Sequence, residues 1–420
     1  MVNLLPTLLE EFYEKLEEVK RGTARRAAFY NAPNLVKVAI GMRRAGKTYF
    51  TLQKVLELLQ NNVPLESILY INFEDDRLLP MDHKAMGKLI DDFFTLFPEN
   101  HTRLCYLFLD EVQNIADWAL VIRRFFDSKK VQIYLTGSSA KLLSKEIATS
   151  LRGRSIETEI WPFSFQEFLE THKQPLPKKP FGKKTFDELR KQFLSYLQIG
   201  GFPAVQFLSA PERLETLQGY VETVILRDII ERHNVTNVAL LRYLIASLIK
   251  NAAAPFSIHK FYNDCKSQGF KVGKDTLYTY VQYIEDAYLL FAVPHFSESA
   301  REIQTNPKKI YVIDSGLFRA NTFIAADSYG KEFENLIYLD LRRQGKNVYY
   351  YKTKNGHEVD FVITSKQESP RLLQVAWDLD DKETRFREER ALQEAQQELG
   401  IKGEILDLQT YLSSCGEKIG

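Results

Sequence analysis

The sequence has few cysteines, and none of them lie close together. Cys105, Cys265 and Cys415 are the only three in 420 residues, and no C-x-x-C spacing occurs. Small disulfide-stabilised domains and zinc sites both depend on paired or clustered cysteines. The sequence therefore argues against a disulfide framework and a structural zinc site, and we expect a reducing, cytoplasmic location.

Long apolar runs are also absent. No stretch reaches the roughly 18 apolar residues of a membrane-spanning helix. The leucine-rich start turns acidic and basic from Glu10 to Lys20, without the charged beginning and cleavage site of a signal peptide. We therefore expect no membrane interaction.

An excess of charge of either sign is missing too. The chain carries 56 Lys and Arg against 55 Asp and Glu, a net charge of +1. Proteins that coat nucleic acid are usually strongly basic, so this balance argues against such a coat but leaves a local basic face open. At roughly 150 residues per domain, the length predicts two or three domains.

The most informative stretch that is present runs from Gly41 to Thr48. It reads Gly-Met-Arg-Arg-Ala-Gly-Lys-Thr and matches the spacing G-x-x-x-x-G-K-[ST]. The apolar run 35–40 precedes it, and residues 49–59 repeat apolar side chains at helical spacing. A plain glycine-rich turn between strand and helix would not require the Lys-Thr pair. The sequence therefore predicts a nucleotide-binding loop.

Each residue type in this loop suits one part of nucleotide binding. Glycines let successive backbone N–H groups face an anion, Lys47 can reach the β- and γ-phosphates and assist catalysis, and the Thr48 hydroxyl is suited to Mg²⁺. Arg43 and Arg44 could touch phosphate, bound nucleic acid or a partner. The predicted nucleotide-binding residues are Gly41, Arg43, Arg44, Ala45, Gly46, Lys47, Thr48 and Tyr49.

Two acids follow a second apolar run. Residues 104–109 are continuously apolar, which is typical of a parallel strand buried on both faces, and Asp110 and Glu111 come directly after them. Ligands of open α/β sheets sit at the carboxyl ends of the strands, so both acids should face the phosphates. Asp110 is suited to hold Mg²⁺, and Glu111 is suited to polarise the attacking water. The alternative is a solvated turn.

Polar residues flank two further predicted strands. Ser138 and Ser139 follow the strand 131–136, and either could contact the γ-phosphate or the attacking water, or cap the next helix. Arg152 and Arg154 precede the strand 156–160 and could stabilise transition-state charge, either in the same chain or from a neighbouring subunit of a homo-oligomer. The alternative is a surface pair without a chemical role.

Together these motifs resemble a bacterial and archaeal group of AAA-type ATPases, in which a C-terminal region catalogued as a domain of unknown function follows the ATPase domain. The resemblance implies an α/β P-loop NTPase fold with a parallel sheet, and ATP with Mg²⁺ as cofactors. It covers nearly the whole chain. The motifs that carry it are the loop 41–48, Leu107–Gln113, Thr136–Ser139, Leu151–Arg154 and Pro162–Phe168.

The predicted division of the chain has five parts, because proline and lysine punctuate the middle of the sequence. They are an N-terminal helix and connector (1–34), an AAA-like ATPase domain (35–170), a basic linker (171–186), a helical region with a winged helix-turn-helix (187–318) and a restriction-endonuclease-like α/β domain (319–420).

The winged helix is predicted from two helical patterns, near 257–265 and 275–287, which a turn at Gly269 separates and β-like runs follow. Its outward face should carry Lys271, Lys274, Tyr278 and Gln282, which could contact double-stranded DNA. A protein contact is the alternative.

The nuclease-like interpretation depends on a weaker constellation. A helix acid, a strand-end Asp and an acceptor two residues before a Lys are typical of these enzymes. Glu334 (or Glu332), Asp360 and Gln374 fit this pattern, but Ala376 stands where the lysine is expected. The sequence therefore predicts the fold and argues against the activity.

Three functions remain open from the sequence. The first is an ATPase that couples ATP binding and hydrolysis to a partner, most readily DNA. The second is a nucleotide-gated interaction switch with little turnover. The third is an ATP-dependent nuclease, in which Lys352 or Lys354 would have to supply the missing cation.

Overall fold

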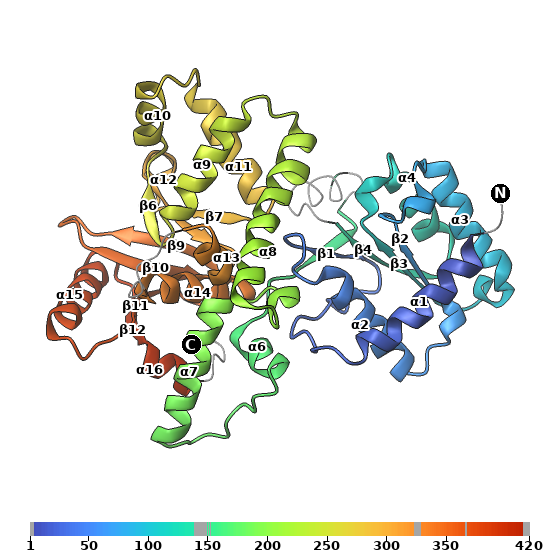
Figure 1. The fold of residues 1–420 in the computed structure, drawn as a ribbon, viewed down its shortest axis with the longest axis horizontal. Helices are drawn as coiled ribbons and strands as arrows, with labels where there is room; N and C mark the ends of the chain where they lie inside the picture. The colour runs from blue at the N-terminus through green and yellow to red at the C-terminus, as the bar shows by residue number, and fades with distance from the viewer. Residues whose placement is uncertain are drawn as a thin grey trace. The chain divides into compact units, whose positions relative to one another are not determined.

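The computed structural model describes residues 4–137, 149, 151, 153–322, 329–365 and 368–414. The chain divides into two compact units, Met1–Trp161 and Pro162–Gly420. Figure 1 shows the first unit in blue to blue-green and the second in green to red. Among the described residues, no helix is both long enough and apolar enough to span a lipid bilayer.

The first unit is built on one sheet of five parallel strands in the order β2-β3-β4-β1-β5. This confirms the predicted α/β class with a parallel sheet. Its elements are α1 (Leu5–Val19), β1 (Val36–Ile40), α2 (Lys47–Gln60), β2 (Ile68–Asn72), α3 (His83–Leu96), β3 (Cys105–Asp110), α4 (Trp118–Ser128), β4 (Val131–Thr136) and β5 (Ser155–Glu159).

The central strands are buried because helices cover both faces of the sheet. Every residue of β1 is buried, as a strand inside a parallel sheet requires. Helix α1 places an apolar stripe on the sheet, where the Phe12 ring stacks on Tyr70 at 5.2 Å between centroids. Parallel strands end at the same edge, so the residues after β1, β3 and β4 come together there.

The second unit contains two smaller sheets. The three-stranded sheet is antiparallel in the order β6-β8-β7, and the four-stranded sheet has the order β12-β11-β10-β9. Strands β9, β10 and β11 are antiparallel neighbours, whereas β11 and β12 are parallel. The strands are β6 (Ala254–Phe256), β7 (Leu290–Val293), β8 (Lys308–Val312), β9 (Asn347–Lys352), β10 (Glu358–Thr364), β11 (Arg371–Ala376) and β12 (Gly403–Asp407).

Helices connect and cover these sheets. The helix α14 leads into the four-stranded sheet, and α15 crosses between its parallel strands β11 and β12 (Figure 1). The helices are α6 (Phe165–Thr171), α7 (Lys183–Ile199), α8 (Ala210–Thr223), the π-helix Val224–Glu231, α9 (Val238–Lys250), α10 (Ile258–Ser267), α11 (Lys274–Asp286), α12 (Ala300–Thr305), α13 (Ser315–Ala320), α14 (Tyr329–Arg343), α15 (Lys382–Leu399) and α16 (Leu408–Ser413).

A buried carboxylate fixes the turn after α7. Gly200 has a φ of +81°, and the Gly201 N–H donates to Asp314 Oδ2 at 2.5 Å. The Leu317 N–H donates to Asp314 Oδ1 at 2.9 Å. Burial raises the pKa of Asp314 to about 6, although these two hydrogen bonds act to lower it. Gly200 and Gly201 therefore allow the backbone to come close to the Asp314 carboxylate, which a side chain at Gly200 would block.

The boundary between the two compact units falls between Trp161 and Pro162, and helix α6 packs with α7 inside the second unit. The predicted division into an ATPase domain ending at residue 170, a linker, a helical region and a nuclease-like domain stays a prediction.

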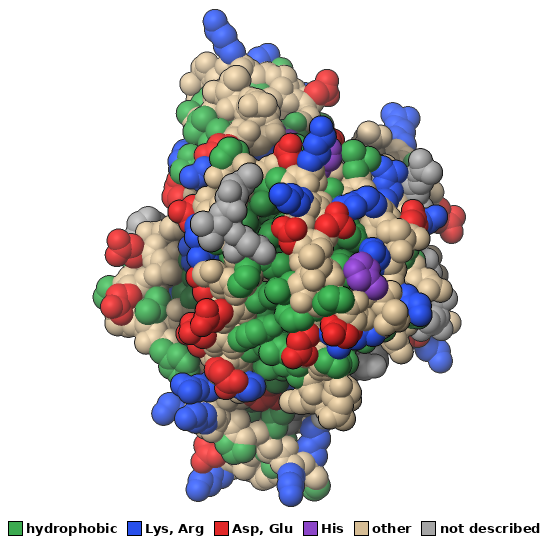
Figure 2. Space-filling view, turned by 90° about the vertical axis from the view of Figure 1, so that its right-hand side faces the viewer, with side chains coloured by type: hydrophobic (Ala, Val, Ile, Leu, Met, Phe, Trp, Pro, Cys, Tyr) green, Lys and Arg blue, Asp and Glu red, His purple; other side chains and the backbone are tan. Residues whose placement is uncertain are grey.

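Charges of both signs are mixed on the face shown in Figure 2. Lys and Arg side chains alternate there with Asp and Glu, around a hydrophobic strip near the centre. This agrees with the net charge of +1. The described residues on this face form no broad positive patch of the kind with which proteins attract nucleic acid.

Candidate nucleotide-binding site

The loop Gly41–Thr48 joins β1 to α2, as its motif requires. Gly41 has a φ of +147°, and a Cβ there would lie 2.2 Å from the Ile160 carbonyl oxygen. Gly46 has a φ of +95° and Arg44 one of +64°. Left-handed residues interspersed in a loop turn successive N–H groups toward one side, which creates an anion-binding concavity.

The Lys47 ammonium lies inside this loop. The side chain is buried, and its Nζ donates to the carbonyl oxygens of Gly41 and Met42, both at 3.1 Å. Lys47 is also the first residue of α2, where helix N–H groups have no intrahelical acceptor. The loop thus combines one fixed positive charge with free backbone donors, which suits a phosphate group.

Asp110 is the buried centre of a hydroxyl network at the end of β3. Its Oδ2 accepts from the hydroxyls of Thr48 and Tyr70, each at 2.8 Å, and its Oδ1 accepts from Thr136. Burial and the charge of Glu111 raise the pKa of Asp110, while the three hydrogen bonds oppose this shift. The structure therefore brings Thr48 and Asp110 together, as predicted for a magnesium site.

Glu111 follows Asp110 in a left-handed conformation, with a φ of +54°. Its backbone N–H donates to Thr136 Oγ1 at 3.0 Å, and its carboxylate accepts from the Gln113 amide. The Thr136 hydroxyl therefore connects the two acids. In an extended strand the side chains of residues 110 and 111 would point to opposite faces of the sheet, and the left-handed turn takes Glu111 out of that alternation.

Three residues of this network were not predicted from the sequence. Thr136 is the last residue of β4 and Tyr70 is the middle residue of β2, the two strands beside β3. A polar residue at the end of an apolar strand was the signal available for Thr136. Arg25 carries no such signal: its guanidinium donates to the carbonyl oxygens of Ala45 at 2.8 Å and Trp161 at 2.6 Å, and so braces the loop from a connector.

Two predicted loop residues have other contacts in the structure. Arg43 forms an ion pair with Glu74 at 3.2 Å, beside the loop. The Tyr49 hydroxyl donates to the Val19 carbonyl oxygen at 2.7 Å, so its side chain is tied to α1. Of the groups of Tyr49, the backbone N–H in the first turn of α2 is the one that could face a phosphate, and the side chain is not.

The predicted catalytic residues outside this network fall into two groups. Ser138 and Arg152 lie outside the described residues. Arg154 precedes β5, and its carbonyl oxygen accepts from the N–H of Val36 at the start of β1. It is therefore at the sheet edge opposite the loop, where it pairs with Asp127 at 2.6 Å. This position does not favour a role at the same chain's nucleotide, and a role at a neighbouring subunit stays a prediction.

A second cluster of charged residues lies in the second unit. Lys309 of β8 places its Nζ 2.7 Å from Glu334 Oε1, 2.7 Å from Glu358 Oε1 and 2.9 Å from Asp360 Oδ1. Glu334 and Asp360 thus come together as the sequence predicted. Glu332, the alternative to Glu334, instead accepts from Arg319 Nε at 2.9 Å and lies apart from the cluster.

The cation of this cluster was not among those considered from the sequence. Lys352 and Lys354 are exposed near the β9–β10 turn, whereas the ammonium in contact with the acids comes from Lys309. Gln374 accepts from the Asp360 N–H at 3.1 Å, and its amide donates to Glu388 at 2.5 Å.

The acids Glu334, Glu358 and Asp360 line a cleft of about 670 Å³, together with Gln374 and Ala376. Within the part of the chain that the structure describes, no three His, Cys, Asp or Glu side chains are arranged to hold a metal ion.

Comparison with known proteins identifies the family. A family model described as an AAA domain matches residues 33–169, and two models described as domains of unknown function match residues 190–328 and 329–410. The uncharacterized protein MJ1544 of Methanocaldococcus jannaschii is 36% identical over 392 residues, which cover 92% of this chain and 84% of that protein. The chain belongs to the same family of AAA-domain proteins. An uncharacterized protein of Haemophilus influenzae is 28% identical and covers 82% of this chain and 83% of its own length.

Solved structures resemble this AAA-domain protein only distantly. The Walker-type ATPase PABY2304 of Pyrococcus abyssi is 15% identical with a TM-score of 0.44, over 74% of this chain and 95% of that chain. The Orc1 protein of Aeropyrum pernix, solved in complex with DNA, is 11% identical with a TM-score of 0.29, over 75% and 91%. Similarity at this level says nothing about the partners of this chain.

Proposed function

We propose that this AAA-domain protein binds ATP with Mg²⁺ at the loop Gly41–Thr48 and hydrolyses it with the help of Glu111. One observation carries the proposal: the buried Lys47 ammonium, the Thr48 hydroxyl and two consecutive acids converge at one edge of a parallel sheet. Phosphoryl transfer depends on positioning and charge compensation, and these groups supply both.

The oxygen atoms beside the loop fit a magnesium ion. The Thr48 hydroxyl and Asp110 Oδ2 lie 2.8 Å apart, and Mg²⁺ prefers such oxygen ligands. Because burial and Glu111 both disfavour the charge on Asp110, a cation beside it would be stabilised. Thr48 and Asp110 would hold the ion, which when bound neutralises charge on the phosphates.

Glu111 is the candidate general base. It follows the magnesium-binding acid by one residue, and its left-handed backbone, held by Thr136, directs its carboxylate separately from that of Asp110. In this role Glu111 orients a water molecule and accepts its proton as the water attacks the γ-phosphate.

Two variants test this assignment. Lys47→Ala should abolish binding of a fluorescent ATP analogue, while Lys54→Ala, which removes a more exposed lysine of the same helix, should leave it intact. Glu111→Gln should bind the nucleotide normally and hydrolyse it about 10²–10⁴-fold more slowly, the usual contribution of a general base. Normal binding by Lys47→Ala, or normal turnover by Glu111→Gln, would contradict the proposal.

We further propose that the ATPase is coupled to DNA binding by the region α9–β8. The order α9, β6, α10, α11, β7, α12, β8 and the antiparallel sheet β6-β8-β7 support the winged-helix interpretation. Helix α11 exposes Lys274, Tyr278 and Gln282, while Leu277, Val281 and Ile284 on its other side are buried.

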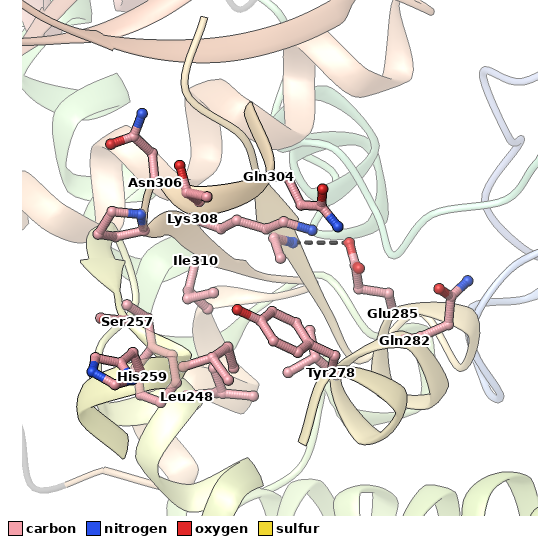
Figure 3. A pocket seen from close by; sticks show the side chains of 16 residues that line it. Leu248, Ser257, His259, Tyr278, Gln282, Glu285, Gln304, Asn306, Lys308 and Ile310 are labelled. Atoms are coloured by element: carbon pink, nitrogen blue, oxygen red, sulfur yellow. Dashed lines mark hydrogen bonds between the residues drawn. The ribbon is translucent and has the colours of Figure 1, made fainter. Parts of the chain in front are cut away.

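A small pocket beside α11 offers further polar contacts. It has a volume of about 170 Å³ and an apolar floor that includes Leu248 and Ile310. Figure 3 shows Tyr278 and Glu285 of α11 on one side of the pocket, with Lys308 and Gln304 across from them, while Gln282 lies at the edge and points away. Aromatic, amide and ammonium groups together are typical of surfaces that contact bases and phosphates.

The coupling is tested by measuring ATP turnover with and without duplex DNA, and DNA binding over a range of salt. Lys271→Glu/Lys274→Glu should weaken binding and reduce the slope of log affinity against log salt by about 1 for each phosphate that the variant no longer neutralises. Lys402→Glu, an exposed lysine outside this region, is the matched control. ATP turnover that DNA does not change, with equal DNA affinity in all variants, would contradict the coupling and favour a DNA-independent role.

A further inference from the structure

A buried ammonium occupies the centre of the acidic cluster in the second unit. Lys309 is only 1% exposed, and its Nζ lies within 2.9 Å of one oxygen each of Glu334, Glu358 and Asp360. The three carboxylates come from α14 and β10, whereas Lys309 comes from β8 of the other sheet. Contacts between the two sheets, rather than local sequence, therefore build this cluster.

The strand β8 supplies a second donor to the same acids. Tyr311, two residues beyond Lys309 and so on the same face of the strand, donates its hydroxyl to Glu334 Oε1 at 2.6 Å. Asp360 Oδ2 also accepts from the Val375 N–H at 3.0 Å. The oxygen atoms that face the centre of the cluster are thus engaged by protein donors.

Buried charge explains why these groups stay together. An ammonium in the interior requires anionic partners, and three neighbouring carboxylates require a cation or protons. A divalent metal ion would need the same carboxylate oxygens. The ammonium and the ion cannot occupy one position, and their charges repel each other, so the residues present do not fit a metal ion while Lys309 is in place.

Two neighbouring positions also bear on a metal ion. Gln374 fits the nuclease pattern as an acceptor, but it is a neutral amide already held between the Asp360 N–H and Glu388. Ala376 stands where a lysine would face a scissile phosphate. One lysine is therefore absent where metal-dependent cleavage uses it, and another is present where the metal ion would lie.

We infer that Lys309 is the resident cation of this cluster and takes the place of a divalent metal ion, so that the cleft beside it works without metal and does not cleave nucleic acid. This inference is independent of the nucleotide-binding proposal, because all residues involved belong to the second unit.

The first test compares the wild-type full chain with Asp360→Asn, without nucleotide. Binding of Mn²⁺ alone is measured by electron paramagnetic resonance, together with nicking of supercoiled DNA in Mn²⁺. Any ion at the ATPase loop is common to both proteins. We expect identical Mn²⁺ binding and no nicking in either. An Mn²⁺ site or a nicking activity that wild type has and Asp360→Asn lacks would overturn the inference.

The second test removes the resident cation. Lys309→Met leaves three carboxylates without their ammonium, so Mn²⁺ should raise the melting temperature of this variant by several degrees more than that of wild type. The double variant Lys309→Met/Asp360→Asn should lose most of this gain. A folded Lys309→Met whose response to Mn²⁺ equals that of wild type would overturn the inference. If Lys309→Met does not fold even with Mn²⁺, the first test decides.

Discussion

Replacing Thr136 with valine tests the connection between the two acids of the nucleotide site. Valine keeps the shape of threonine and removes one hydroxyl, which is fully buried. That hydroxyl accepts from the Glu111 N–H at 3.0 Å and donates to Asp110 Oδ1. The substitution therefore leaves a buried donor and a buried carboxylate oxygen each without a partner.

The expected loss follows from these two contacts. An unpaired buried N–H costs about 1–3 kcal/mol, and a hydrogen bond to a charged group contributes about 1.5–3 kcal/mol. The first unit should therefore lose about 2.5–6 kcal/mol of stability. Because Glu111 also loses the group that holds its backbone, ATP turnover should fall while nucleotide binding at the loop persists.

Hydrogen exchange of peptides from β3 and β4 measures this loss within the first unit. Thr136→Ser is the matched control, since serine keeps the hydroxyl and should retain most of the protection and turnover. The reasoning would be refuted by exchange in Thr136→Val within about 0.5 kcal/mol of wild type, or by equal losses in Thr136→Ser.

Three further predictions concern single residues. Gly41→Ala should disrupt the loop and abolish ATP binding, because its Cβ would lie 2.2 Å from the Ile160 carbonyl oxygen; Gly182→Ala, with open space around it, should bind ATP normally in the same titration. Arg25→Met should weaken ATP binding and lower the melting temperature of the first unit, because it removes two hydrogen bonds that brace the loop. Asp314 has a pKa of about 6 in the folded protein and about 3.9 when unfolded, so the native state binds more protons between these values. Urea titrations should show stability falling by up to about 3 kcal/mol as pH rises from 4 to 7, and Asp314→Asn should flatten this dependence.

Sequence reasoning could predict most of the first unit because its signals are local. The strands β1, β3 and β4 are mostly apolar, and the loop at Gly41–Thr48 has a fixed spacing between a strand and a helix. The convergence of Thr48 with Asp110 follows from one rule, that parallel strands share a carboxyl edge.

Contacts between distant segments could not be predicted in this way. Arg25 reaches the loop from an irregular connector, and Lys309 reaches its acids from a different sheet. Neither contact leaves a periodic pattern in the sequence, because each depends on how elements pack after they form. The second unit shows the same limit: sequence reasoning sought the cation of the acidic cluster at Lys352 and Lys354, whereas the ammonium comes from Lys309 of β8.

The position of Lys309 also has a mechanical consequence for the second unit. Pulling β8 away from β10 would separate the buried Lys309 ammonium from three carboxylates, and the Phe296 N–H would lose its hydrogen bond to the Tyr350 carbonyl oxygen, 2.7 Å from the nitrogen. The two sheets therefore resist hinging against each other. We therefore expect a force applied at α11 to move the three-stranded and four-stranded sheets together as one rigid body.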